Sequence, residues 1–205
     1  MSIRQGLLAL LGQRSMYGYQ LRNEFEARTG ATWPLNVGQV YTTLRRLERD
    51  GLVEPAGKDD EGHVFYEVSE NGRAEVDEWF STPVNRTSRP RDELAIKLAM
   101  AVSTPNADVR QIVQDQRTHT VRALQDYTRL KARATTGDDL AWLLVLDSLI
   151  FQAEAEVRWL DHCESRVARA AATREAAGEI DDRETANPAA PAGTHEGAIH
   201  ERHRT

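Results

Sequence analysis

Four polar side chains between residues 36 and 53 could recognise DNA, because their spacing would place them on one face of a helix. They are Gln39, Thr42, Thr43 and Arg46. A glutamine amide can pair with adenine, an arginine with guanine or a phosphate, and a threonine methyl group can contact the methyl group of thymine. A solvated helix face with incidental arginines is the alternative interpretation, and the helix alone does not decide between the two.

The same segment has the features of a short helix with a buried inner side. Asn36 is a suitable N-cap, since its side-chain oxygen can accept a hydrogen bond from a free N–H group of the first turn. Gly51 ends the helix, where glycine takes the left-handed conformation without a Cβ clash. The candidate DNA-binding residues therefore also include Asn36 at the start of the helix and Arg45 near its end. The inner side is apolar: Val37, Val40, Leu44 and Leu47.

Composition limits the classes of protein to consider. The chain has 205 residues, 40% of them hydrophobic, which is enough for one substantial domain or two small ones. Its single cysteine excludes an intramolecular disulfide and fits a reducing compartment. No apolar run approaches the roughly 18 to 20 residues of a membrane span, and the apolar start is too short for a secretion signal. We expect a cytoplasmic protein that does not bind to or span a membrane.

The net charge of −6 argues against indiscriminate binding of nucleic acid. Even the first 80 residues contain more Asp and Glu than Lys and Arg. An acidic protein can still carry a local basic patch, so the charge is an objection to DNA binding and does not exclude it.

The elements around the candidate helix predict a winged helix-turn-helix domain over residues 1–82. Helices are expected at 3–13 and from Gly18 onward, with a short turn before the helix that begins after Asn36. Two extended runs separated by a glycine-bounded polar loop then predict a β-hairpin, the wing. The loop carries Lys58 and His63 beside three carboxylates. We therefore expect the wing to touch the DNA backbone through Lys58 or His63 at its base, or not at all.

The second half of the chain predicts long helices that associate with a second copy. Residues 83–91 read as a linker, 92–172 as an α-helical dimerisation domain and 173–205 as a disordered tail. The helices carry more apolar surface than one pair can bury, which favours a symmetric homodimer. The predicted interface residues are Leu7, Leu143, Leu146, Leu149, Ile150, Ala153, Val157 and Leu160. The predicted fold class is mainly α with a small β-hairpin wing.

Three blocks of the first 80 residues resemble a known family. They are Tyr17-Gly18-Tyr19-Gln20-Leu21, the run from Gly38 to Val53, and Tyr66-Glu67-Val68-Ser69-Glu70-Asn71-Gly72. Their order is similar to that of the PadR-family winged-helix transcriptional regulators, and the long C-terminal helices resemble a longer subgroup that uses them to dimerise. The resemblance implies a dimeric repressor on a palindromic operator and a phosphate contact by Tyr41. The acidic wing tip departs from the family, in which this tip is often more basic.

A small aromatic effector is a further partner that the resemblance suggests, because some relatives release DNA on binding a phenolic acid or a flat aromatic drug. Trp142 and Trp159 are the candidate pocket residues, contributed from each end of the last helix or from each subunit. Seventeen residues separate them, which is ~25 Å along a helix. Packing at a subunit interface is the alternative role for both tryptophans.

An enzyme is not expected. Cys163 lies between His162 and Glu164 on a predicted helix, where sequence neighbours point about 100° apart and do not form a catalytic pair. A small core or interface residue is the default role for this cysteine. The chain has no glycine-rich cofactor-binding unit and no cluster of metal ligands, so neither a cofactor nor a metal is expected. The main competitor to a DNA-binding regulator is a winged helix used only for protein–protein contact.

Overall fold

The computed structural model describes residues 2–85, 91–134 and 140–186 of the chain. These divide between two compact units, Met1–Leu160 and Asp161–Thr205. Residues 86–90 of the expected linker at 83–91 lie outside the described part, so this boundary stays a prediction. None of the described helices is both long enough and apolar enough to span a membrane.

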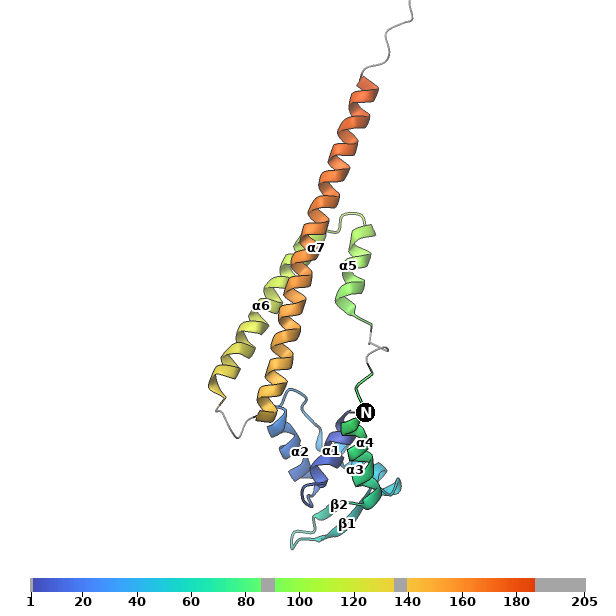
Figure 1. Cartoon of the computed structure of the whole chain (residues 1–205), viewed down its shortest axis with the longest axis vertical. Helices are drawn as coiled ribbons and strands as arrows, with labels where there is room; N and C mark the ends of the chain where they lie inside the picture. Colours follow the sequence, from blue (N-terminus) through green and yellow to red (C-terminus); the bar gives the residue numbers. More distant parts are fainter. Residues whose placement is uncertain (1, 86–90, 135–139, 187–205) are drawn as a thin grey trace, which may run out of the picture. The chain divides into compact units, whose positions relative to one another are not determined.

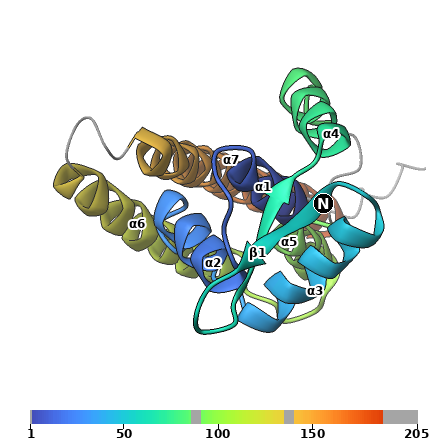
Figure 2. The ribbon, with the colours of Figure 1, turned by 90° about the horizontal axis from the view of Figure 1, so that it is seen from below.

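Residues 2–81 form the expected winged helix-turn-helix (Figures 1 and 2). The strands pair antiparallel, with Val53 opposite Val68 and a bulge between Pro55 and Gly57. A bridge between Met16 and Tyr66 joins the α1–α2 connection to the second strand. The elements are α1 (Ser2–Leu11), α2 (Gly18–Arg28), α3 (Val37–Arg49), β1 (Val53–Lys58), β2 (Val64–Val68) and α4 (Glu70–Ser81).

Side-chain caps fix where two of these helices begin. The Asn36 side-chain oxygen accepts a hydrogen bond of 2.8 Å from the Gly38 N–H at the start of α3, as the sequence predicts. Ser69 accepts from the Gly72 N–H over 3.1 Å at the start of α4. Gly51 has a φ of +72° just after α3, which confirms the glycine stop.

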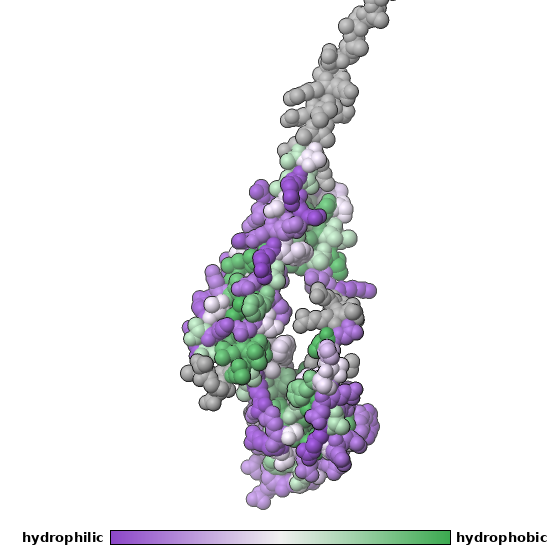
Figure 3. Space-filling view, in the orientation of Figure 1, coloured by the Kyte–Doolittle hydropathy of each residue, from purple (hydrophilic) through white to green (hydrophobic). Residues whose placement is uncertain are grey.

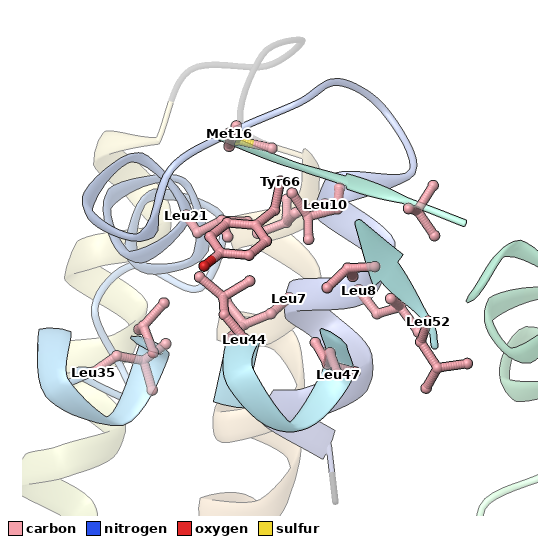
Figure 4. Packing of buried hydrophobic residues seen from close by; sticks show 14 residues of the cluster. Leu7, Leu8, Leu10, Met16, Leu21, Leu35, Leu44, Leu47, Leu52 and Tyr66 are labelled. Carbon is pink, nitrogen blue, oxygen red and sulfur yellow. The ribbon is translucent and has the colours of Figure 1, made fainter. Parts of the chain in front are cut away.

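One hydrophobic core holds the winged helix together, and α1 lies at its centre (Figure 4). Leu7 and Leu8 of α1 are completely buried and pack with Leu44 and Leu47 from the inner side of α3. The assignment of Leu7 to a dimer interface is therefore wrong for this structure, because the chain's own core already covers its side chain. The broad apolar stripe of α1 reflects contacts with several neighbouring elements within one chain.

The C-terminal helices are α5 (Glu93–Ser103), α6 (Val109–Arg133) and α7 (Leu140–Ala186). Two side-chain hydrogen bonds between α6 and α7 show that these helices run antiparallel. Lys131 Nζ lies 2.5 Å from Asp147 Oδ1, and farther along, Thr120 Oγ1 donates to Glu156 Oε1 over 2.5 Å. The α7 side of this contact is a heptad stripe of buried residues: Leu146, Ala153 and Leu160.

That stripe corrects the predicted dimer interface. Leu146, Ala153 and Leu160 are buried within one chain, so they are not available to a partner. The remaining predicted residues, Leu143, Leu149, Ile150 and Val157, are half-buried. The sequence pattern identified a real apolar stripe and assigned it to the wrong contact, because its partner is α6 of the same chain.

Helix α7 continues through residues 173–186, which the sequence interpretation placed in the tail. Alanine, glutamate and arginine dominate this stretch, and all three favour helix even without tertiary packing. The rest of the expected tail, 187–205, lies outside the described residues.

Candidate nucleic-acid interface

The outer face of α3 displays the four residues that the sequence singled out. Gln39, Thr42 and Arg46 are exposed, and Thr43 is half-buried beside them. A hollow of about 550 Å³ runs along this side of the helix, and Ile3 and Arg4 at the start of α1 also line it. The spacing prediction therefore holds geometrically, since all four border one surface feature. Their contact with DNA remains a prediction.

The arginine side chains of α3 differ in whether they already have a hydrogen-bond or ion-pair partner. Arg45 donates from Nε to the Tyr41 carbonyl over 3.4 Å, and Arg49 lies 2.9 Å from the Asp50 carboxylate. The guanidinium of Arg46 makes no hydrogen bond or ion pair within the described residues, although the Arg46 carbonyl accepts from the Asp50 N–H. The Arg46 guanidinium keeps all five N–H donors for a ligand, which makes it the strongest candidate for bidentate contact with guanine or a phosphate.

A carboxylate on α2 fixes the turn that leads into α3. Glu26 Oε1 accepts hydrogen bonds from the backbone N–H of Leu35 over 2.9 Å and from Arg22 Nε over 3.1 Å. The Leu35 hydrogen bond is the main cause that lowers the pKa of Glu26, and Arg22 adds to it against the opposing effect of burial. Because Leu35 itself is buried, these contacts hold the start of α3 against α2.

Tyr41 packs its ring against the first residue of α2. A Cβ atom added to Gly18 would lie 2.7 Å from Cζ of the Tyr41 ring, so a residue without a side chain is needed there. The close approach explains why glycine stands between Tyr17 and Tyr19. It also fixes the position of the tyrosine to which the family resemblance gives a phosphate contact.

We expect Tyr41→Phe and Gly18→Ala to weaken DNA binding in the same way. The first removes the hydroxyl, and the second displaces the ring by the clash with Cζ. A hydrogen bond to a charged group contributes ~1.5–3 kcal/mol, so affinity should fall by about ten- to a hundredfold for each half-site. Anisotropy titrations should show an equal loss on all duplexes, since a phosphate contact carries no sequence information. A sequence-dependent loss would contradict a phosphate role for Tyr41.

The wing residues occupy more restrained positions than the sequence suggested. The His63 ring stacks on Tyr17 with centroids 4.6 Å apart, and its Nδ1 lies 2.9 Å from Asp59 Oδ2. Burial alone would raise the pKa of Asp59, but hydrogen bonds from His63 and the Glu61 N–H outweigh it and lower the pKa. Lys58 is exposed at the end of β1. The acidic tip thus holds His63 in place, and Lys58 is the freer candidate for a phosphate.

Three residues of the site region were not anticipated from sequence. Ile3 and Arg4 line the hollow beside α3, and Tyr17 supports His63. Arg4 is bonded to the Glu75 carboxylate of α4 and lies 3.8 Å from Asp50. No spacing rule links residue 4 to a helix that begins at residue 37, because only the folded core brings them together.

Cys163 lies half-buried on α7. Burial raises the pKa of the Cys163 thiol, while nearby Arg166 opposes this. A raised pKa keeps the thiol protonated, the reverse of what a nucleophilic cysteine requires. Among the described residues, no three His, Cys, Asp or Glu side chains gather where they could hold a metal ion.

A second surface feature lies on α7, on the side opposite the stripe that faces α6. Leu144 and Phe151 are 62% and 65% exposed, and the exposed residues Leu140 and Trp159 extend the same apolar region. We call Leu140, Leu144, Phe151 and Trp159 the outer α7 face. Hydrophobic surface gathers over the α6–α7 pair in Figure 3. The predicted dimer interface did not include Leu140, Leu144 or Phe151.

The tryptophans proposed as an effector pocket remain apart. Trp142 is half-buried and Trp159 is exposed, and both lie on the straight run of α7 at a separation of ~25 Å. Neither lines the hollow beside α3 or a smaller hollow of about 250 Å³ between α6 and α7. One described chain therefore does not bring them together.

Comparison with known proteins covers both halves of the chain. Residues 7–78 match the Transcriptional regulator PadR-like family, and residues 90–168 match the family described as Virulence activator alpha C-term. A probable transcriptional regulator of Mycobacterium tuberculosis, Rv1176c, is 28% identical over 181 residues, which cover 78% of this chain and 95% of the relative.

Solved structures share the same fold. Bacillus subtilis PadR in complex with operator DNA superposes with a TM-score of 0.63 at 19% identity, covering 82% of this chain and 99% of that one. The same protein in complex with p-coumaric acid gives a TM-score of 0.65 at 20% identity, with the same coverage. The matched families and relatives are transcriptional regulators and not enzymes. The winged helix of this chain is thus a domain of the PadR-like family of transcriptional regulators, and it is followed by helices that match the Virulence activator alpha C-term family.

Proposed function

We propose that the chain is a sequence-specific repressor that binds a palindromic operator as a homodimer in the cytoplasm. The observation that carries this proposal is the outer face of α3, where Gln39 and Arg46 are exposed beside Thr42 and Thr43. Helices of this kind place such side chains against base edges in the major groove. The DNA complex of Bacillus subtilis PadR, which has the same fold, supports the assignment.

The outer α7 face supports the homodimer. Leu144 and Phe151 are more than half exposed, and large apolar side chains in one patch are costly to leave in water. A second copy that packs there would form a symmetric pair and carry two α3 helices. Two-fold symmetry then matches a palindrome when the reading helices lie about one DNA turn apart, ~34 Å.

We further propose that a small aromatic molecule releases the DNA. Support comes from the Bacillus subtilis PadR structure with p-coumaric acid. Trp142 and Trp159 remain our candidates, with the pocket completed by the second subunit. A ligand bound between subunits would change the separation of the two α3 helices, and it would act by favouring one arrangement over the other.

A winged helix that binds only protein is the second candidate function. The net charge of −6 favours it, because phosphates are repelled by an acidic surface. It leaves the unpaired Arg46 and the exposed Gln39 on α3 without a role. DNA titration separates the two functions directly.

The first test is fluorescence anisotropy with the duplex upstream of the protein's own gene, a scrambled duplex as competitor and a series of salt concentrations. A regulator should bind specifically. Its affinity should fall steeply as the salt concentration rises, because binding releases counterions from the phosphates and this release is less favourable at high salt. A folded protein that binds neither the upstream duplex nor duplexes selected from a random pool would support the protein-interaction module instead.

An Arg46→Ala variant tests the residue that is proposed to contact a base. Loss of a bidentate base contact should weaken binding by ~1–3 kcal/mol per half-site and relax the preference at one base pair in each half-site. Arg73→Ala removes one positive charge from an exposed site on α4 and serves as the matched control. Equal binding by the wild type and Arg46→Ala would remove Arg46 from the interface.

A further inference from the structure

We infer that Thr42 and Thr43 recognise thymine through their methyl groups and not through their hydroxyls. The inference rests on the proposed DNA binding and specifies the chemistry that the operator must present. It assigns two kinds of base contact to the side chains on the outer face of α3. Gln39 and Arg46 supply hydrogen bonds, and the two threonines supply apolar contacts to the C5-methyl groups of thymine.

The hydroxyl hydrogens of both threonines are already donated to the helix backbone, which leaves the hydroxyls only as acceptors. Thr42 Oγ1 donates to the Gly38 carbonyl over 2.8 Å, and Thr43 Oγ1 donates to the Gln39 carbonyl over 2.8 Å. A hydroxyl has one hydrogen to donate, so neither can donate to a base while these bonds persist. A backbone bond to the residue four positions earlier also restricts the threonine to the few side-chain conformations that reach it.

The methyl group is the remaining apolar part of each side chain at this surface. Thr42 is exposed and Thr43 is half-buried, and both border the hollow beside α3. Ile3, which is 41% exposed, adds an apolar group to the same hollow. A face that displays methyl groups next to free amide and guanidinium donors is complementary to a major groove with thymine methyls beside purine edges.

Thymine and adenine pair with each other on opposite strands, so a single A·T base pair presents both an adenine edge and a thymine methyl group. Gln39 lies three and four residues before the two threonines, on the same side of the helix. A glutamine that pairs with the adenine edge and a threonine that contacts a nearby thymine methyl would together read an A·T-containing step. We therefore expect the half-site next to residues 39–43 to contain thymine.

The test uses duplexes selected from a random pool by the full-length protein and then amplified with dUTP in place of dTTP. Deoxyuridine keeps the base pair and lacks only the C5-methyl group. Burial of one methyl group is worth ~0.8 kcal/mol, or about fourfold in affinity, and each contact occurs twice in a symmetric dimer. Each threonine should then account for about a fifteenfold loss when the duplex contains deoxyuridine.

Protein variants separate the methyl group from the hydroxyl. Thr42→Ser and Thr43→Ser keep the hydroxyl and lose the methyl, so each should bind the thymine duplex about fifteenfold more weakly and show a correspondingly smaller loss on the uracil duplex. Thr42→Val and Thr43→Val keep the methyl and should bind both duplexes like the wild type. Thr128→Ser is the matched control, because its hydroxyl makes the same backbone bond in α6, to the Leu124 carbonyl over 2.8 Å.

Three outcomes would overturn the inference, and each is distinguishable. Wild-type binding that is equal on thymine and uracil duplexes removes the methyl contacts and leaves the DNA-binding function intact. Serine variants that bind like the wild type, together with valine variants that lose affinity, would assign the contact with the base to the hydroxyls. A folded wild-type protein that enriches no duplex from the pool would overturn the proposed function and this inference together.

Discussion

A Gly72→Ala variant is expected to lose several kcal/mol of folding stability, because no space exists for a Cβ atom at this position. The added carbon would fall well inside van der Waals contact with the Leu52 carbonyl oxygen and 2.7 Å from Val68 Cγ2. The nearest atom belongs to the backbone and cannot rotate away. Overpacked cores typically lose ~1–3 kcal/mol, and a clash with fixed backbone should reach or exceed the upper limit.

The backbone around Gly72 is held by several hydrogen bonds, which is why it cannot yield. The Ser69 N–H donates to the Leu52 carbonyl over 3.0 Å, and the Ser69 hydroxyl donates to the Gly51 carbonyl over 2.7 Å. Together they bring the start of α4 onto the residues that follow α3. An alanine at position 72 would have to separate these segments, so the damage should extend to the seating of α3.

Thermal and urea unfolding of the full chain would measure the effect. A loss of ~3 kcal/mol should lower Tm by roughly 10–20 °C in a domain of this size, with α3 losing its fixed position before global unfolding. Asn71→Ala is the matched control, since the exposed neighbouring side chain can be truncated without a clash. If both variants unfold at the wild-type temperature, the close packing of α4 on Leu52 is incorrect.

Gly72 belongs to a recognisable sequence signature, but the physical reason for its glycine is visible only in the structure. The run from Ser69 to Gly72 is recognisable as a family signature, and Ser69 as an N-cap, from residue types alone. The requirement for glycine comes from the Leu52 carbonyl, which lies twenty residues earlier. Local rules therefore predicted the start of α4, whereas the reason for its glycine depends on a tertiary contact.

The fold was predictable because local signals and helical periodicity agree over residues 1–81. Asn36 caps α3, Gly51 ends it, and the buried positions of α3 recur as the apolar pattern requires. The outer face of α3 followed from the same periodicity. The engagement of Arg45 and Arg49 and the stacking of His63 on Tyr17 did not, since they depend on rotamers and on neighbours distant in sequence.

Helix α7 was predicted as a helix but with the wrong division of its surface. Periodicity identifies apolar residues and does not say which partner covers each of them. The inner stripe, represented by Leu146 and Leu160, is buried against the same chain, and the outer residues Leu144 and Phe151 are left exposed. A helix with two apolar sides can contact two different partners, and a single sequence cannot say which partner covers which side.

A Leu144→Glu, Phe151→Glu double variant is expected to be monomeric and to lose most of its operator affinity. Both side chains are well exposed in one chain, so glutamates there should leave the monomer folded while placing like charges at the centre of the proposed dimer contact. A monomer engages one half-site and loses the effective concentration that links two. The expected loss in affinity is therefore ~10²–10⁴-fold.

Sedimentation equilibrium and anisotropy on the same samples would measure both effects. Thr118→Glu, Gln125→Glu is the matched control, because it adds the same charge at exposed polar positions of α6. A truncation that ends before Asp138 removes α7 entirely and should also be monomeric and bind weakly. If the double variant or the truncation remains dimeric, the two copies do not meet through the outer α7 face. If the double variant is monomeric yet binds the operator at full affinity, two-fold symmetry is not what sets affinity, and the spacing of two α3 helices would no longer explain a palindromic site.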